Sequence, residues 1–324
     1  MADQRKPRIL VTRPMLDPVM AALDADYDIV ALGRDDSIPS PQEVIAAAEG
    51  AEAICLVFYG GPAALLSALP DSVRMIASFG VGVDHIELAA AKDKGLIVTN
   101  TPDAVVDATA DIAFGLIIAS ARKFYEREKT LREGRWTNFS PTADLGRDVT
   151  GKTLGIIGLG PIGRAVAERA RGFRMKLIYH SRTRKPDAEA ALGLEWREDV
   201  DAVAAEADFL SLHCALAPET RHIIDARRLG LMKPTAFLIN TGRGPLVDEA
   251  ALVAALRDGT IMGAGLDVYE REPKLAEGLA ELDNVTLLPH IGSGTVETRE
   301  AMGFRLKANL DAWFATGEPG DRVV

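Results

Sequence analysis

The sequence predicts an α/β protein built from two doubly wound domains, each a parallel β-sheet covered by helices. Three observations support this fold class. At 324 residues the chain is too long for one small hydrophobic core. Short apolar runs alternate with helix-like segments throughout the chain, which is typical of parallel sheets. A glycine-rich turn lies in the middle of the chain, at residues 158–163.

The predicted strands are short apolar runs in two sets. In the first third of the chain they are residues 8–12, 27–30, 53–58, 73–77 and 96–99. These runs predict a flavodoxin-like doubly wound unit that has no phosphate-binding turn. The second set consists of residues 153–157, 176–180, 208–213, 236–240, 264–268 and 285–288. These six strands match the two mononucleotide-binding halves of a Rossmann domain.

The glycine-rich turn has the context that dinucleotide binding requires. It follows an apolar run and opens a helix-like stretch at 164–171. Its first glycine permits a tight reversal, its second leaves room for a pyrophosphate, and its third lets helix and strand pack closely. The helix start offers free N–H groups to phosphate. An ordinary βα turn is the alternative. The predicted cofactor residues here are Gly158, Leu159, Gly160, Pro161, Ile162 and Gly163.

The end of the next strand bears on the choice of dinucleotide. An acidic residue there usually binds the adenosine ribose and favours NAD. Here the segment reads His180-Ser181-Arg182-Thr183-Arg184 and has no carboxylate to repel a 2′-phosphate. Two arginines and two hydroxyl groups are suited to bind one. We therefore expect NADP(H) to be preferred, with NAD(H) possible. The alternative is that the two arginines are solvated surface charges.

Helical patterns connect and follow the two sheets. Residues 107–133 form a long helical pattern, interrupted only by Gly115, which we interpret as the connection between the domains. The tail at 296–316 has apolar residues at helical spacing and is expected to pack back on the first domain. The predicted substrate domain is therefore discontinuous, comprising 1–102 plus 293–324. The NAD(P)-binding Rossmann domain, 103–292, is inserted into it, and a ligand is expected in the cleft between them.

Composition narrows the class of protein. The chain is 48% hydrophobic and 26% charged, as is typical of globular proteins. Its net charge of −10 argues against nucleic-acid or membrane partners. Cys55 and Cys214 form no metal-ligand motif, so no metal is expected. No signal peptide or apolar run of membrane-spanning length is evident, so a cytoplasmic enzyme is expected.

Polar strings follow three strand ends in the second domain, where loops face the ligand crevice. Arg243 has a planar fork of donors that could hold a carboxylate and polarise a carbonyl. His290 is the best acid–base candidate, because imidazole changes charge near neutral pH. A carboxylate paired with this histidine would fix its tautomer and favour its protonated form. Glu272 and Glu270 are both available for that role, and the residue pattern does not separate them.

The chain resembles the D-isomer-specific 2-hydroxyacid dehydrogenase family over nearly its whole length. The matching segments are residues 78–84, 158–163, 240–244, 265–273 and 289–293. The resemblance implies that Arg243 binds substrate, that Glu272 pairs with the histidine and that His290 donates the proton. It implies that backbone amides near Val81 and Gly82 bind the substrate carboxylate. The remaining predicted cofactor residues are Thr109, Thr241, Asp267 and Gly292.

Within the family, the chain is most similar to the glyoxylate/hydroxypyruvate reductases, whose members often lack the acid after the second strand. Residues 134–141 are similar to their dimerisation loop, in which an aromatic side chain reaches the partner's site. The resemblance thus implies a homodimer, with Phe139 as that aromatic residue. The alternative is that Phe139 packs in its own subunit.

The predicted reaction is the NAD(P)H-dependent reduction of a small 2-oxo acid, glyoxylate or hydroxypyruvate, to the D-2-hydroxy acid. Two alternatives remain open. One is another activity of the family, on D-lactate or 3-phosphoglycerate; the other is a dinucleotide-sensing, corepressor-like binding protein. A phosphorylated substrate would require basic residues near 55–61, and that segment has none, so a small uncharged tail is favoured.

Overall fold

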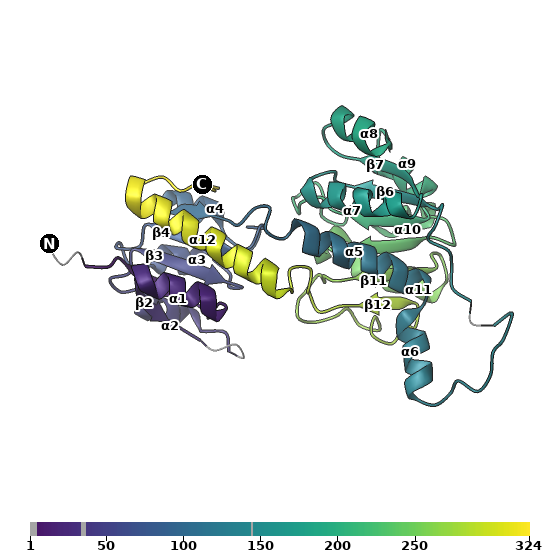
Figure 1. Cartoon of the computed structure of the whole chain (residues 1–324), viewed down its shortest axis with the longest axis horizontal. Helices are drawn as coiled ribbons and strands as arrows, with labels where there is room; N and C mark the ends of the chain where they lie inside the picture. Colours follow the sequence, from purple (N-terminus) through teal and green to yellow (C-terminus); the bar gives the residue numbers. More distant parts are fainter. Residues whose placement is uncertain (1–4, 34–36, 144) are drawn as a thin grey trace. The chain divides into compact units, whose positions relative to one another are not determined.

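The computed structural model describes residues 5–33, 37–143 and 145–324. Contacts within the chain divide it into two units (Figure 1). The first consists of Met1–Val105 and Gly294–Val324, and the second of Val106–Ser293. Each unit has its own parallel sheet, so the predicted α/β fold class is confirmed.

The first unit contains a parallel sheet of order β2-β1-β3-β4-β5, which is the flavodoxin-like order. Its strands are β1 (Arg8–Val11), β2 (Asp28–Ala31), β3 (Ala53–Val57), β4 (Met75–Phe79) and β5 (Ile97–Thr99). All five predicted strands are present, although β4 begins and ends two residues later than predicted. Helices α2 (Pro41–Ala47), α3 (Ala63–Ala68) and α4 (Leu88–Asp93) share a hydrophobic core on one face of this sheet.

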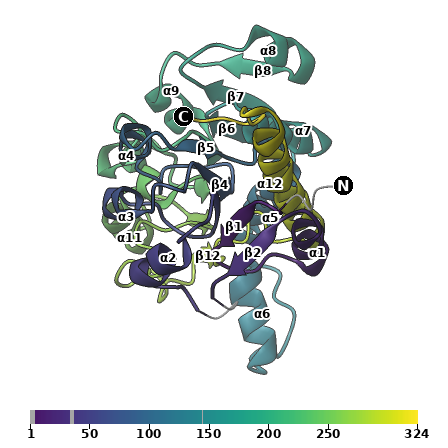
Figure 2. The ribbon, with the colours of Figure 1, turned by 90° about the vertical axis from the view of Figure 1, so that its left-hand side faces the viewer.

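The opposite face carries α1 (Asp17–Asp26) and α12 (Val296–Thr316), which lie side by side in Figure 2. The predicted tail helix has the same bounds as α12 and packs on β4. Gly303 allows its close contact with α1, because a Cβ at that position would lie 2.6 Å from Val19 Cγ2. Tyr27 donates a hydrogen bond of 2.6 Å to Asp311, and Asn309 donates one of 3.1 Å to the Asn100 carbonyl. The tail is therefore an integral layer of the first unit.

The second unit has a sheet of order β12-β11-β10-β9-β6-β7-β8, seven strands within the described residues 153–287. The strands are β6 (Thr153–Ile157), β7 (Lys176–His180), β8 (Leu194–Trp196), β9 (Phe209–Leu212), β10 (Phe237–Asn240), β11 (Gly263–Leu266) and β12 (Val285–Leu287). The predicted count of six was wrong, because β8 was missed. This edge strand has three residues, Leu-Glu-Trp, which is too few to show an alternating pattern.

Helices cover both faces of the second sheet. One face carries α5 (Val106–Ala121), α7 (Pro161–Gly172) and α8 (Pro186–Leu192), and the other carries α9 (Val200–Glu206), α10 (Ala226–Leu231) and α11 (Glu249–Arg257). Leu154 and Ile156 point into the first of these cores, while Ile157 belongs to the other. This alternation is expected for strands buried on both faces.

The predicted helical pattern at 107–133 forms two helices that both belong to the second unit, α5 and α6 (Phe124–Arg132). Gly115, the only interruption of the sequence pattern, lies within α5 and does not break the helix. The break falls at Lys123, whose φ is 56°. There the Arg147 amide donates a 2.7 Å hydrogen bond to the Ala121 carbonyl, so a distant loop terminates α5.

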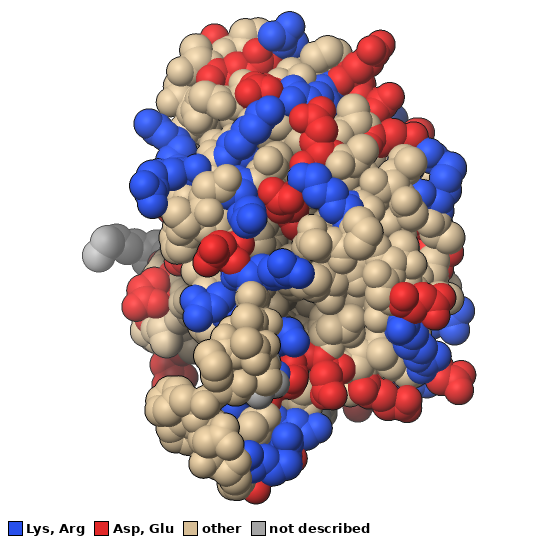
Figure 3. All heavy atoms as spheres, turned by 90° about the vertical axis from the view of Figure 1, so that its right-hand side faces the viewer, with Lys and Arg blue, Asp and Glu red and all other residues tan. Residues whose placement is uncertain are grey.

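Acidic and basic side chains lie next to one another on the face in Figure 3. Ion pairs among the described residues include Arg197 with Glu195 and Glu206, and Arg227 with Asp201. No helix in the described part of the chain has both the length and the apolar character of a membrane span. Within the same residues no group of three potential ligands is arranged to hold a metal ion.

Candidate active site

The glycine-rich turn joins β6 to α7, and each of its glycines has a distinct environment. Gly158 has a φ of 94°, and a Cβ there would lie 2.5 Å from the Cys214 nitrogen. A Cβ on Gly163 would lie 2.3 Å from the Gly158 oxygen, so helix and turn are in direct contact. A Cβ on Gly160 would meet no atom within 4 Å, which leaves the space in front of the turn open.

Gly160 is also the N-cap of α7, and no side chain caps this helix. The first-turn N–H groups of a 12-residue helix are therefore free to bind an anion. The uncapped N-terminus of α7 offers N–H donors, and Gly160 has no side chain to block them. Both features fit the pyrophosphate of a dinucleotide.

The loop after β7 holds the predicted 2′-phosphate residues. Ser181 Oγ donates a 2.7 Å hydrogen bond to the Thr183 carbonyl. Arg184 binds both carboxylate oxygens of Glu189 at 2.8 Å. Arg182 is exposed and makes no ion pair with any described residue. Of the two arginines, Arg182 is thus the one whose guanidinium is uncommitted.

Glu189, on α8, is a residue that the sequence reasoning missed. It also accepts a 2.7 Å hydrogen bond from Tyr179 at the end of β7. The hydrogen bonds from Arg184 and Tyr179 lower the pKa of Glu189 to about 2. Glu189 lies one helical turn into α8, within reach of Arg184 in the preceding loop. A sequence prediction that included α8 would have indicated this pair.

His290 and Glu272 come together after β12 and β11. The distance from His290 Nδ1 to Glu272 Oε2 is 2.8 Å. Glu272 Oε1 accepts a 2.9 Å hydrogen bond from the Tyr269 amide. Burial acts to raise the pKa of Glu272, but the hydrogen bonds from His290 and Tyr269 outweigh it and leave the pKa lowered. The carboxylate is therefore charged and fixed in its direction.

Glu270 faces another histidine. Its Oε1 lies 2.7 Å from His222 Nε2 and accepts a 3.0 Å hydrogen bond from Arg221. The two acids that the sequence left as alternatives thus have different partners, and it is Glu272 that contacts His290.

Asp267 orders the loop that carries His290. Its side chain is 1% exposed, and its two oxygens accept hydrogen bonds from the amides of Ile291 at 2.8 Å and Gly292 at 2.7 Å. Burial raises the pKa of Asp267 against the opposing effect of these amides. Thr109 Oγ1 donates to the Gly292 carbonyl at 3.4 Å. Three predicted cofactor residues therefore form one cluster next to His290.

Arg243 follows β10, and Gly244, the residue after Arg243, is packed tightly. The Arg243 carbonyl accepts a 2.9 Å hydrogen bond from Asn240 Nδ2, and the Arg243 guanidinium donates one of 2.9 Å to the Gly242 carbonyl. A Cβ on Gly244 would lie 1.8 Å from the carbonyl carbon of Tyr269. The loop with Arg243 is thus seated against the loop with Glu272. Thr241 is buried beside it, and its hydroxyl has no hydrogen-bond partner among the described residues.

The predicted carboxylate-binding residues, Val81 and Gly82, lie in the first unit, in the loop after β4. This loop is held by hydrogen bonds from Asn100 Nδ2 to the Val81 carbonyl at 2.8 Å and from the Thr101 amide to the Gly80 carbonyl at 2.9 Å. Phe139 lies between α6 and β6 and is 88% exposed, with its ring against Trp136. It is therefore not buried in its own subunit.

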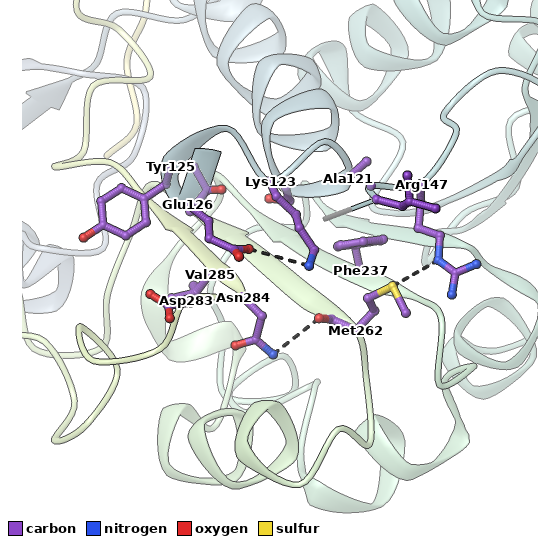
Figure 4. A pocket seen from close by; sticks show the side chains of 14 residues that line it. Ala121, Lys123, Tyr125, Glu126, Arg147, Phe237, Met262, Asp283, Asn284 and Val285 are labelled. Atoms are coloured by element: carbon purple, nitrogen blue, oxygen red, sulfur yellow. Dashed lines mark hydrogen bonds and ion pairs between the residues drawn. The ribbon is translucent and has the colours of Figure 1, made fainter. Parts of the chain in front are cut away.

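A separate pocket lies at the amino-terminal ends of strands in the second sheet (Figure 4). Its lining includes Phe237 and Val285, the first residues of β10 and β12, and Lys123 at the helix break. The candidate site residues follow the carboxyl ends of these strands instead. The pocket is therefore distinct from the candidate active site.

A Rossmann sheet with an open glycine turn and a histidine–carboxylate pair at its carboxyl edge defines a nicotinamide-dinucleotide-dependent oxidoreductase. The family model "D-isomer specific 2-hydroxyacid dehydrogenase, NAD binding domain" matches residues 114–292. The chain belongs to the D-isomer-specific 2-hydroxyacid dehydrogenase family, as the sequence resemblance predicted.

Relatives match over almost the whole chain. A glyoxylate reductase of Thermococcus litoralis is 44% identical over 98% of this chain and 97% of its own length. The structure of a glyoxylate reductase from Paecilomyes thermophila has a TM-score of 0.88 at 36% identity, covering 98% of this chain and 98% of that one. An NADPH-dependent glyoxylate/hydroxypyruvate reductase from Sinorhizobium meliloti, in complex with NADP and malonate, has a TM-score of 0.86 at 37% identity, covering 98% and 97%.

Proposed function

We propose that this protein reduces a small 2-oxo acid, glyoxylate or hydroxypyruvate, to the D-2-hydroxy acid with NAD(P)H. The observation that carries the proposal is the 2.8 Å contact between His290 Nδ1 and Glu272, which leaves Nε2 of the imidazole for a substrate oxygen. The glyoxylate reductase of Thermococcus litoralis, similar over 98% of this chain, supports the choice of substrate.

The residues have separate roles in this mechanism. Arg243 binds the carboxylate of the oxo acid and stabilises the charge that develops on its carbonyl oxygen. Backbone amides near Val81 and Gly82 bind the same carboxylate. When bound, a reduced nicotinamide would supply hydride chemistry at C2 of the oxo acid. His290 gives its proton to the carbonyl oxygen, and Glu272 orients the imidazole through its contact with Nδ1. The turn at 158–163 would hold the dinucleotide, with Asp267 fixing the adjoining loop.

A panel of 2-oxo acids tests the proposal. With NADPH or NADH in excess, glyoxylate and hydroxypyruvate should support cofactor oxidation, followed as loss of absorbance, with pyruvate and 3-phosphohydroxypyruvate as comparisons. A higher kcat/KM with pyruvate or the phosphorylated acid would favour the D-lactate or 3-phosphoglycerate alternative. If the protein binds the dinucleotide but no acid supports oxidation, the enzyme proposal fails and a corepressor-like role gains support.

We further propose that NADP(H) is preferred to NAD(H), with Arg182 as the main contact to the 2′-phosphate. A charged hydrogen bond contributes about 1.5–3 kcal/mol, so R182A should raise KM for NADPH roughly 10–100-fold. KM for NADH should stay within a few-fold. R184A is the matched control and should have a smaller effect, because Arg184 is already bound by Glu189. Wild-type protein that uses NADH better than NADPH would contradict the preference.

We propose a homodimer in which Phe139 reaches the partner's active site. Residues 133–143, which follow α6, extend as a loop from their own unit (Figure 1), and the apolar side chains of Trp136, Phe139 and Leu145 are exposed. Light scattering should give twice the chain mass, and F139A should raise KM for the oxo acid several-fold. L131A, an exposed change on α6, is the control. A monomer with full activity would refute the dimer.

A further inference from the structure

Arg299 is unlike the other basic residues of α12 within the described chain. Arg305 is paired with Asp321 at 2.5 Å, and Lys307 with Asp26 at 2.5 Å and Asp311 at 2.9 Å. Arg299 has no carboxylate partner among the described residues, and its Nη1 is shielded from solvent without a hydrogen bond. Burial lowers the pKa of Arg299, as expected for a cation that is partly desolvated and unpaired.

The Arg299 guanidinium lies over an aromatic ring at the carboxyl end of the first sheet. The Arg299 guanidinium carbon lies 4.3 Å from the ring centroid of Phe58, the residue that follows β3. Phe58 has a φ of 47°, which is a strained conformation for an aromatic residue, and it is half-exposed. Its ring packs edge-on against Phe79, the last residue of β4, at 5.3 Å. Arg299, Phe58 and Phe79 therefore form a row of contacting side chains, and the loop with Val81 and Gly82 begins directly after Phe79.

This arrangement changes one expectation from the sequence. The segment 55–61 has no basic residue of its own, which favoured a substrate with an uncharged tail. The fold brings Arg299 onto Phe58 from a helix that lies more than two hundred positions later in the chain. A basic group is thus present beside the segment that was predicted to lack one.

We propose that Arg299 is a specificity residue that binds the substituent on C3 of the 2-oxo acid, a hydroxyl or an anionic group. The inference rests on the proposed function, in which Val81 and Gly82 bind the C1 carboxylate. An unpaired guanidinium has donors to offer, and the ring face beneath it holds its plane in place. Hydroxypyruvate carries an oxygen on C3, whereas glyoxylate has no C3. Arg299 therefore favours the longer, polar-tailed acid.

The test compares the two acids in each variant. In R299M the ratio of kcat/KM for hydroxypyruvate to that for glyoxylate should fall about 10–100-fold relative to wild type, the scale of a lost charged hydrogen bond. R299K, which keeps the charge but not the planar fork, should recover part of the ratio. R305M, on the same helix but paired with Asp321, should leave the ratio unchanged. D-Glycerate should raise the thermal midpoint of wild type more than glycolate does, and R299M should lose that difference.

The outcomes separate the two proposals. If wild type reduces neither acid, the proposed function fails. If wild type reduces both and R299M changes the two kcat/KM values by the same factor, the role of Arg299 is refuted while the proposed function stands. A thermal midpoint of R299M close to that of wild type shows that the variant is folded, and R299K provides a second comparison if it is not.

Discussion

H290A is expected to lower kcat by about 10²–10⁴-fold, the usual effect of removing a general acid. The imidazole of His290 is the group that the structure orients by a carboxylate, with 2.8 Å between Nδ1 and Glu272 Oε2. Steady-state NAD(P)H oxidation with glyoxylate measures the effect. The matched control is H222A, which removes a histidine whose Nε2 lies 2.7 Å from Glu270 and should change kcat by no more than a few-fold. Near-normal turnover in H290A would exclude His290 as the proton donor.

The pH dependence gives a second readout of the same pair. Hydrogen bonds from His290 and Tyr269 leave the pKa of Glu272 lowered despite its burial, so its carboxylate stays charged as pH falls below the ordinary range of glutamate. Wild-type kcat/KM for reduction should therefore hold as pH falls to the ordinary pKa of glutamate, and be lost only below it, where Glu272 takes up a proton. E272Q has no titrating carboxylate at this position, so it should lack that low-pH loss and show a lower kcat/KM at neutral pH. E270Q should keep the wild-type profile, and a wild-type profile in E272Q would show that Glu272 does not support the proton donor.

G244A is expected to lower kcat/KM by about 100-fold or more, although Gly244 offers no side chain for chemistry. A Cβ there would lie 1.8 Å from the carbonyl carbon and 2.0 Å from the oxygen of Tyr269, so the backbone must move. The loop that moves carries Glu272, and the residue before Gly244 is Arg243. A displacement of about 1 Å in such groups can cost about 10²-fold in rate.

Overpacking at this position should also destabilise the protein, by about 1–3 kcal/mol. Thermal unfolding and steady-state kinetics of G244A measure the two effects. G230A is the control, because a Cβ on Gly230 meets no atom within 4 Å. If G244A retains wild-type kcat/KM, then the contact between the two loops does not position the site.

The sequence predicts the strands and helices whose own residues show a recognisable apolar pattern. The bounds predicted for β6 and β7 match the structure, because each strand contains a short stretch of buried apolar residues, such as Ile156 and Ile157 in β6 and Leu177 to Tyr179 in β7. β8 has only three residues and gives no such pattern. The end of α5 could not be predicted either, since it depends on a hydrogen bond from Arg147, 26 positions later.

The same limit applies to the candidate site. Glu270 and Glu272 are two residues apart, and only the folded loop turns one toward His222 and the other toward His290. The partner of Arg184 and the position of Arg299 over Phe58 are likewise set by packing between helices and loops. Sequence identifies which residue types follow strand ends, and tertiary structure decides their partners.

The return of the chain to the first unit has a consequence for its synthesis. The last residues complete the first sheet's edge, where the Val98 amide donates to the Val324 carbonyl at 3.1 Å and the Val323 amide to the Val98 carbonyl at 2.7 Å. On the ribosome, residues 1–105 therefore emerge early but wait for α12, while residues 106–293 are made in between. At about 5–20 residues per second this delay is roughly 10–40 s. The inserted unit can finish folding first, and the unit that begins the chain is the last to be completed.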